Sequence, residues 1–527
     1  MALLLSMLTL AASSYAQTFA QQCQNFQVNI PNVKVNVLEF VPNGTNITFP
    51  YTDPTCAPLY QLTYGGDVCR VAMNVTTSNA SNIFLEAWLP SQWSGRFLST
   101  GNGGLAGCIG YSAIAYANSY GFAAVGANNG HNGTSGRPFL NSPEVVEDFA
   151  YRSVHTGVIV GKQLTQQFYA SSINHSYYLG CSTGGRQGMK MAQDFPGDFD
   201  GIVAGAPAFD FNHLTDWSGW LSSVAGYDNT SSDFITAGLW SVINNEILRQ
   251  CDTLDGAKDN IIEDPDLCRP YLESLICSPS ATNTSACLNQ GQYNRAVKSL
   301  EPLYNSSGTL IYPRLQPGGQ AAAYPFFFNG RPFIYTSDYY KYAVYNNASW
   351  DATTLSQADF TYLDNLDPYK ISTWNGNLSP FASRGGKILT YHGLQDPLIT
   401  SDNSARYYSH LSSTMSLPPN SIDDFYRYFR ISGMGHCSGG PGSWDIGQGY
   451  VGRPKGVSSP QNNVLEAIVA WIEKGEAPEY VEGIKWVNDT ASAGVVSFKR
   501  RHCRYPRRNV YTGTGDGKDE EGWKCVL

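Results

Sequence analysis

Residues 176–194 read SYYLGCSTGGRQGMKMAQD, and this segment carries the clearest indication of the fold. Its start, 176–179, has the aromatic residues of a strand, and 187–194 has the composition of a helix. Between them, Gly180-Cys181-Ser182-Thr183-Gly184 fits G-x-S-x-G, the sharp strand-to-helix turn that lifts a nucleophilic serine above a sheet. The pattern alone is common, but this context is the one it requires. We therefore predict that Ser182 is a nucleophile rather than part of a glycine turn without chemistry.

Strands and helices alternate on both sides of this segment, which indicates an α/β fold with a mostly parallel sheet. The strand predictions rest on runs of β-branched and aromatic residues bounded by turns, and the helix predictions rest on the spacing of apolar residues. The predicted strands are 83–89, 96–100, 122–126, 387–391 and 425–431, and the predicted helices are 144–169 and 464–473.

Residues 209–373 differ from the flanking sequence because they are rich in Tyr, Asn, Ser and Trp and lack the regular alternation. We interpret them as a lid domain inserted into a catalytic domain formed by 17–208 and 374–527. No internal repeat is evident.

A serine nucleophile needs a base and an orienting carboxylate, which are expected in loops after downstream strands. Asp396 follows the predicted strand 387–391, and His436 follows 425–431. His392 is a competing base, but its place at a strand end favours a packed structural role. The oxyanion would be bound by backbone amides, one from Thr183 and one from the glycine-rich segment 101–104, within which Gly103 is our choice.

Cys181 precedes the predicted nucleophile, and Cys437 follows the predicted base. A disulfide between them would fix the distance between serine and histidine, whereas the alternative is that each pairs elsewhere.

Composition points to a secreted globular protein without nucleic-acid or membrane partners. The net charge is −9, and the basic clusters 499–501 and 507–508 are short, which argues against nucleic-acid binding. Residues 1–16 are apolar, too short to span a bilayer, and end in Ser14-Tyr15-Ala16, as a signal peptide would. The twelve cysteines include no C-x-x-C pair and are expected in disulfides. Twelve N-x-S/T sequons predict glycosylation at Asn43, Asn46, Asn74, Asn79, Asn132, Asn174, Asn229, Asn283, Asn305, Asn347, Asn377 and Asn488.

Three motifs together resemble the secreted tannase and feruloyl esterase family, most closely its fungal type B feruloyl esterases. They are Gly-Cys-Ser-Thr-Gly-Gly-Arg-Gln-Gly at 180–188, His-Gly-x-x-Asp at 392–396 and Gly-Met-Gly-His-Cys at 433–437. The resemblance implies an α/β-hydrolase fold with a large inserted lid domain and a Ser182, Asp396 and His436 triad. It also implies the disulfides Cys181–Cys437, Cys251–Cys268, Cys23–Cys69, Cys56–Cys108, Cys277–Cys287 and Cys503–Cys525.

The segment 251–261 places three carboxylates around a glycine turn, which suits a hard cation about as well as it suits an acidic surface loop. The resemblance favours a structural calcium ion in the lid, and no organic cofactor. The implied ligands are the side chains of Asp252, Asp255 and Asp259 and the carbonyl groups of Ala257 and Ile261.

The expected activity is that of a serine esterase on ferulate, p-coumarate and caffeate esters of plant cell-wall polysaccharides such as xylan. The first alternative is a tannase acting on galloyl esters, since both activities share the motifs. A catalytically inactive binding protein is a weaker alternative because all three triad residue types are present. A metallohydrolase is weaker still, because the sequence has no H-E-x-x-H motif.

Overall fold

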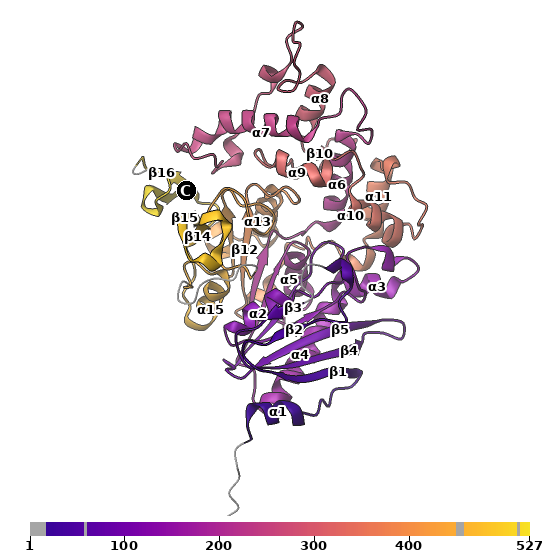
Figure 1. Cartoon of the computed structure of the whole chain (residues 1–527), viewed down its shortest axis with the longest axis vertical. Coiled ribbons are helices and arrows are strands. Elements are labelled where there is room, and N and C mark those ends of the chain that lie inside the picture. Colours follow the sequence, from indigo (N-terminus) through magenta and orange to yellow (C-terminus); the bar gives the residue numbers. More distant parts are fainter. Residues whose placement is uncertain (1–16, 57–60, 450–457, 514–516) are drawn as a thin grey trace, which may run out of the picture.

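The computed structural model describes residues 17–56, 61–449, 458–513 and 517–527 (Figure 1). The predicted signal peptide, 1–16, lies outside the described residues. Within them, the centre of the molecule is a nine-stranded sheet in the order β1-β4-β5-β7-β6-β8-β9-β12-β13. Its strands are β1 (Val33–Val41), β4 (Val68–Thr76), β5 (Asn82–Pro90), β7 (Ala123–Ala127), β6 (Arg96–Thr100), β8 (His175–Cys181), β9 (Gly201–Gly205), β12 (Lys387–Gly393) and β13 (Tyr426–Ile431).

The sheet is mixed, so the prediction of a mostly parallel sheet holds for only part of it. Strands β7, β6, β8, β9, β12 and β13 are parallel, whereas β1, β4 and β5 run antiparallel at one side. The short turn between β4 and β5 accounts for the antiparallel pairing of those two strands, because a parallel pair needs a crossover of a dozen residues or more. All six strands predicted from the sequence, including 176–179 in β8, are present, and β1, β4 and β9 were not predicted.

Helices cover both faces of the sheet, and the strand residues are buried on both sides, as in other largely parallel sheets. One face packs against α4 (Ser153–Tyr169), α5 (Thr183–Asp194) and α13 (Asp402–Met415). The other face packs against α2 (Tyr111–Ser119) and α15 (Val464–Lys474). Adjacent residues on β8 divide between the two cores: Tyr178 belongs to the first and Tyr177 to the second.

The helix predicted at 144–169 is interrupted. It consists of α3 (Pro143–Glu147), a π-helical turn (Asp148–Arg152) and α4. The buried Arg186 guanidinium donates hydrogen bonds to the carbonyl groups of Phe149 and Ala150 in that turn. The wider turn therefore supplies the acceptors that hold α5, the helix of the predicted nucleophile, against its neighbours.

The chain between β9 and β12 forms a mainly helical layer beyond the carboxyl ends of the parallel strands (Figure 1). Its α-helices within residues 209–373 are α6 (Phe211–Ala225), α7 (Ala237–Cys251), α8 (Gln290–Lys298), α9 (Gln320–Phe327), α10 (Ile334–Asp338) and α11 (Gln357–Leu366). They share their own hydrophobic core around Trp217, Trp240 and Phe327. The arrangement agrees with an inserted lid, whose limits of 209 and 373 stay a prediction. Among the described residues, no helix is long and apolar enough to cross a membrane.

Candidate active site

Ser182 lies at the turn from β8 into α5, and its backbone has a positive φ of 66°. Non-glycine residues rarely adopt this conformation, and such strain is typical of a nucleophile turn. The flanking glycines permit it. A Cβ atom on Gly184 would lie 2.9 Å from the Asn102 carbonyl oxygen, and one on Gly180 would lie 2.7 Å from the Gly184 carbonyl oxygen. The backbone packs so closely around the serine that only glycine fits at positions 180 and 184, which explains the motif.

The structure brings together the three residues of the predicted triad. His436 Nε2 lies 2.9 Å from Ser182 Oγ, and His436 Nδ1 lies 2.7 Å from Asp396 Oδ2. These residues come from the loops after β8, β12 and β13, which end at the same edge of the sheet. A base within hydrogen-bonding reach of the serine, itself oriented by a carboxylate, is the arrangement that nucleophilic catalysis requires.

Asp396 is fully buried and accepts hydrogen bonds from several groups. Its Oδ1 accepts from the backbone amides of Leu398 and Ile399, and its Oδ2 lies 3.2 Å from His392 Nε2. Burial acts to raise the pKa of Asp396, but the charges and hydrogen bonds of His436 and His392 outweigh it and hold this pKa below its ordinary value. Asp396 is therefore ionised when the His436 imidazolium forms beside it, and its negative charge can stabilise that imidazolium.

His392 is buried and is not beside the serine, which agrees with a structural role. It lies 2.7 Å from Ser404 Oγ through Nδ1, and its Nε2 approaches both the Ile399 carbonyl oxygen and Asp396. Its contact with the triad carboxylate was not predicted, and the only signal was the four-residue spacing from Asp396.

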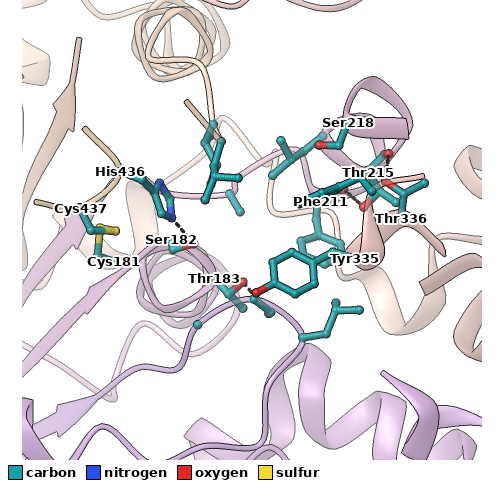
Figure 2. Close-up of a pocket in the computed structure, with 18 of the residues that line it drawn as sticks. Cys181, Ser182, Thr183, Phe211, Thr215, Ser218, Tyr335, Thr336, His436 and Cys437 are labelled. Atoms are coloured by element: carbon teal, nitrogen blue, oxygen red, sulfur yellow. Dashed lines mark hydrogen bonds between the residues drawn. A yellow bond between two sulfur atoms is a disulfide. The ribbon is translucent and has the colours of Figure 1, made fainter. Parts of the chain in front are cut away.

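A disulfide joins Cys181 to Cys437, with their Cα atoms 6.0 Å apart (Figure 2). It links the residue before the serine to the residue after the histidine. The other five disulfides join the pairs that the resemblance implied, and no free cysteine is found in the described residues.

Thr183 and Gly103 both line the cavity next to Ser182. Thr183 is the first residue of α5, so its amide has no acceptor within the helix, and the positive end of the helix favours a developing oxyanion. The Thr183 hydroxyl donates to the Gly104 carbonyl oxygen at 2.8 Å, which holds the glycine loop against the elbow. The placement agrees with the predicted oxyanion donors, whose role stays a prediction.

A buried amide network holds the glycine loop from behind, and it was not predicted. Gln187 Nε2 donates to the side-chain oxygens of Asn102 and Asn129, and Gln187 Oε1 accepts from the Asn102 amide. Asn102 in turn donates to the carbonyl groups of Cys108 and Ala127. The one feature of the sequence that could have predicted this network is Gln187 itself, because the inner side of the elbow helix is normally apolar.

The triad opens into a cavity of about 390 Å³ between the catalytic domain and the lid (Figure 2). Among the described residues, no Asp, Glu, Lys or Arg side chain lines it, and most of its wall is apolar. The apolar side chains are Leu105, Ala208, Phe211, Leu214, Phe333, Leu398 and Ile399. Beyond the catalytic edge with Ser182, Thr183 and Ser438, the polar groups are lid hydroxyls, those of Thr215, Ser218, Tyr335 and Thr336.

The lid hydroxyls differ in how far they are already engaged. Thr215 donates to the Phe211 carbonyl oxygen, and Thr336 donates to the Thr215 carbonyl oxygen. Ser218 is buried and has no hydrogen-bond partner among the described residues. Figure 2 shows Ser218 across the cavity from Ser182 and His436. The cavity therefore has an unengaged hydroxyl at the end remote from the nucleophile.

The acidic loop at 252–261 packs against the C-terminal region. Asp252 Oδ1 accepts from the amides of Asp259 and Asn260, and Asp255 Oδ1 accepts from the Ala257 amide. Asp255 Oδ2 is buried without a partner. Ala257 and Ile261 are buried beside these carboxylates.

Arg500 balances part of the negative charge of this loop, since it pairs with Asp259 and with Glu263 at 3.2 Å. Over the described residues, no group of three or more His, Cys, Asp or Glu side chains is placed to hold a metal ion by itself. A cation here would therefore need carbonyl ligands as well. The orphaned oxygen of Asp255 and the excess of buried carboxylates over Arg500 fit a divalent cation with oxygen ligands.

Comparisons with known proteins give one consistent result. The family model described as "Tannase and feruloyl esterase" matches residues 67–331 and 332–526. A probable feruloyl esterase B-2 of Aspergillus fumigatus is 52% identical over 99% of both chains, and a probable feruloyl esterase B of Aspergillus clavatus is 53% identical over 99% of both.

Solved structures agree with this result. The crystal structure of feruloyl esterase B from Aspergillus oryzae has a TM-score of 0.92 at 49% identity, covering 97% of this chain and 100% of that one. A tannin acyl hydrolase from Aspergillus niger has a TM-score of 0.72 over 97% of this chain and 96% of its own, at 21% identity, and so shares the fold.

Proposed function

This chain belongs to the tannase and feruloyl esterase family, and from that premise we propose that it is a secreted serine esterase that releases hydroxycinnamic acids from their esters. It has the α/β-hydrolase fold, and its relatives identify it as a carboxylic ester hydrolase of the feruloyl esterase type. The observation that carries the proposal is a hydrogen-bonded Ser182, His436 and Asp396 set at the mouth of an apolar cavity.

In the acylation step, His436 Nε2 takes the proton of Ser182 Oγ as that oxygen attacks the ester carbonyl carbon. The carbonyl oxygen becomes an oxyanion, which the amides of Thr183 and Gly103 would stabilise. Asp396, buried and ionised, stabilises the imidazolium. The imidazolium then gives its proton to the leaving alcohol, and the acyl group remains on Ser182.

In the deacylation step, water takes the place of the departed alcohol. His436 removes a proton from that water as its oxygen attacks the acyl carbon. The second oxyanion then collapses, the bond from the acyl carbon to Ser182 Oγ breaks, and the His436 imidazolium returns its proton to Ser182 Oγ as the acid is released. The Cys181–Cys437 disulfide joins the backbone segments of serine and histidine through both steps.

The cavity favours a hydroxycinnamoyl group over the galloyl group that a tannase would accept. Its wall is mainly apolar, and the lid hydroxyls of Ser218 and Tyr335 line it without a hydrogen-bond partner in the described part of the chain (Figure 2). A feruloyl ring presents one hydroxyl and one methoxy group, whereas a galloyl ring presents three hydroxyls that each require a partner when buried. The distant likeness to a tannin acyl hydrolase supports the fold alone.

The experiment that tests the function measures kcat/KM for methyl ferulate, methyl caffeate and methyl gallate with the purified protein. We expect the first two to be hydrolysed at least about tenfold more efficiently than the third, because burying unpaired hydroxyls costs more than 1 kcal/mol. A preference for methyl gallate would replace this proposal with the tannase alternative.

Ser218 provides a sharper test of how the ring is bound. We expect Ser218→Ala to lower kcat/KM for methyl ferulate by about fivefold to tenfold, the value of one neutral hydrogen bond. Methyl cinnamate, which has no ring hydroxyl, should change less than about twofold. Ser223→Ala, on the exposed side of the same helix, is the matched control. An equal loss for both esters would mean that Ser218 only shapes the cavity.

Secretion and glycosylation are part of the proposal. All twelve sequon asparagines are exposed or half-exposed, as glycan attachment requires, and the six disulfides suit an oxidising compartment. The natural substrates would be feruloylated polysaccharides of the plant cell wall, including xylan.

We also propose a structural calcium ion in the lid loop. Its ligands would be the carboxylates of Asp252, Asp255 and Asp259 and the carbonyl groups of Ala257 and Ile261. When bound, the ion would neutralise buried carboxylates and connect the lid to the C-terminal region that contributes Arg500. It would supply no chemistry to the triad.

Calcium removal should therefore lower thermal stability. We expect the Tm in EGTA to lie several degrees below the Tm in excess calcium, because a ligand at one hundred times its Kd stabilises the folded state by about 2.7 kcal/mol. Asp255→Asn should melt lower and lose this calcium response, whereas Asp424→Asn, at an exposed site outside the lid, should keep it. A wild-type Tm that is the same in both buffers would rule out the ion.

A further inference from the structure

A second cavity, of about 790 Å³, lies where α13 meets the lid, and it shares no lining residue with the catalytic cavity. One wall is α13, and the other is formed by lid segments around β10 (Leu303–Tyr304) and β11 (Leu310–Tyr312). We call it the arginine groove, and it is defined by Arg269, Arg314, Arg406, Trp374, His410 and Tyr505. None of the catalytic steps uses it.

The three guanidinium groups form no ion pair within the described part of the chain. Arg269 Nη1 donates to the carbonyl groups of Asp266 and Cys268. Arg314 Nη2 donates to those of Pro265 and Cys268. Arg406 Nη1 donates to the Asn403 side chain at 2.9 Å. Each guanidinium is thus held through one nitrogen, and its other N–H groups are not engaged by these contacts.

The acidic residues of the groove do not cancel this charge. Glu301 is paired with Lys298, its carboxylate 2.6 Å from the ammonium group. Asp402 accepts a hydrogen bond from Gln316, so the three guanidinium groups line the groove with one carboxylate that is not in an ion pair. The groove is therefore a local positive region on a chain whose net charge is −9.

The cationic side chain on α13 is held in place by an aromatic plane. The Arg406 guanidinium carbon lies 5.4 Å from the centre of the Trp374 ring, and the His410 ring stacks on Trp374 at 5.4 Å with an interplanar angle of 11°. A group oriented before binding loses less conformational entropy when the ligand arrives. The Arg406 side chain is therefore held in one orientation, as is typical of a binding site, whereas arginines on an open charged surface are mobile.

We propose that the arginine groove is a second binding site, whose ligand is a polysaccharide segment bearing uronic-acid carboxylates. Planar guanidinium groups bind carboxylates with two parallel hydrogen bonds, which matches three arginines with unengaged N–H groups. The net negative charge disfavours general attraction of polyanions, so the recognition must be local. An open groove also suits a chain that continues beyond it, whereas small ligands usually bind in enclosed pockets.

Such a site would hold an acidic polymer while its ester groups meet the triad in the separate cavity. Tethering the polymer raises the effective concentration of its esters near Ser182. This consequence rests on the proposed esterase function. Binding of the polymer does not, because it requires no hydrolysis.

The test uses Ser182→Ala as the parent protein and ester-free polygalacturonate as the probe, with mobility in affinity gels giving Kd. We expect Arg269→Ala with Arg406→Ala to raise Kd at least about tenfold, since two charged contacts are lost. Arg406→Lys alone should bind more tightly than Arg406→Ala, because it keeps the charge without the paired donors. The control is Arg137→Ala, an exposed arginine outside the groove, which should change Kd less than about twofold.

Thermal melting would verify that each variant is folded, and neutral arabinoxylan would serve as the uncharged polymer. The proposal is overturned if the double variant binds polygalacturonate like its parent, if Arg137→Ala weakens binding equally, or if arabinoxylan binds as tightly. Failure of the esterase function is a separate result, because it would appear as an absence of methyl ferulate hydrolysis by the unmodified protein.

Discussion

Ser182→Ala is expected to lower kcat for methyl ferulate by about 10⁴-fold to 10⁶-fold, with little change in KM. The substitution removes the only atom that forms the acyl-enzyme and leaves the binding cavity otherwise intact. In serine hydrolases generally, loss of the nucleophile leaves only the contribution of the oxyanion donors and substrate binding. Steady-state kinetics on the purified variant measures this change.

The control for this prediction is Ser241→Ala, a serine on an exposed side of α7 whose activity should match the wild type. A serine-directed phosphonate should label the wild type at Ser182 and should not label the variant. If the variant kept more than about one hundredth of the activity, the assignment of the nucleophile would be wrong. If the wild type hydrolysed no ester and took up no phosphonate but bound hydroxycinnamoyl sugars, the binding-protein alternative would replace the esterase.

Replacing both Cys181 and Cys437 by alanine is expected to lower kcat/KM by about 100-fold or more and to destabilise the protein by several kcal/mol. Without the disulfide, the loops of Ser182 and His436 are joined only by non-covalent contacts, and a displacement of about 1 Å at a catalytic group costs on the order of 100-fold in rate. The disulfide joins positions 256 residues apart, so its loss also frees a large loop in the unfolded chain. Kinetics and denaturant unfolding measure the two effects.

The lid disulfide Cys277–Cys287 provides the matched control, because it closes a separation of only 10 residues and neither cysteine lines the catalytic cavity. Its double alanine variant should keep kcat/KM within about twofold and lose less stability. A Cys181→Ala, Cys437→Ala protein with normal kcat/KM and reduced stability would show that the bond serves folding alone.

Much of the catalytic centre could be predicted because it depends on local backbone patterns. The elbow needs Gly180 and Gly184 where a side chain would collide with neighbouring backbone, and that requirement is visible in the sequence as G-x-S-x-G. Asp396 and His436 each follow a run that reads as a strand, and the carboxyl ends of parallel strands share one edge of the sheet. The position of each residue directly after a strand was therefore enough to predict that their side chains meet at that edge.

Other features had no local signature. The antiparallel pairing of β1, β4 and β5 depends on which strands meet, and the π-helical turn at Asp148–Arg152 depends on the carbonyl groups that Arg186 needs. The amide network of Gln187 joins segments that are 58 and 85 residues away in the sequence. Periodicity describes each segment separately, so it cannot reveal such contacts.

The sequence by itself indicated the α/β class, the nucleophile turn and the order of Ser182, Asp396 and His436 along the chain, because turn chemistry and apolar spacing act within short stretches of chain. Only the tertiary structure decided that His392 also contacts Asp396, that Ser218 faces the substrate cavity with its hydroxyl unengaged, and that three arginines line one groove. These relations arise when distant segments pack together. Packing is set by the shapes and charges of all the partners at once, and no single stretch of sequence contains them.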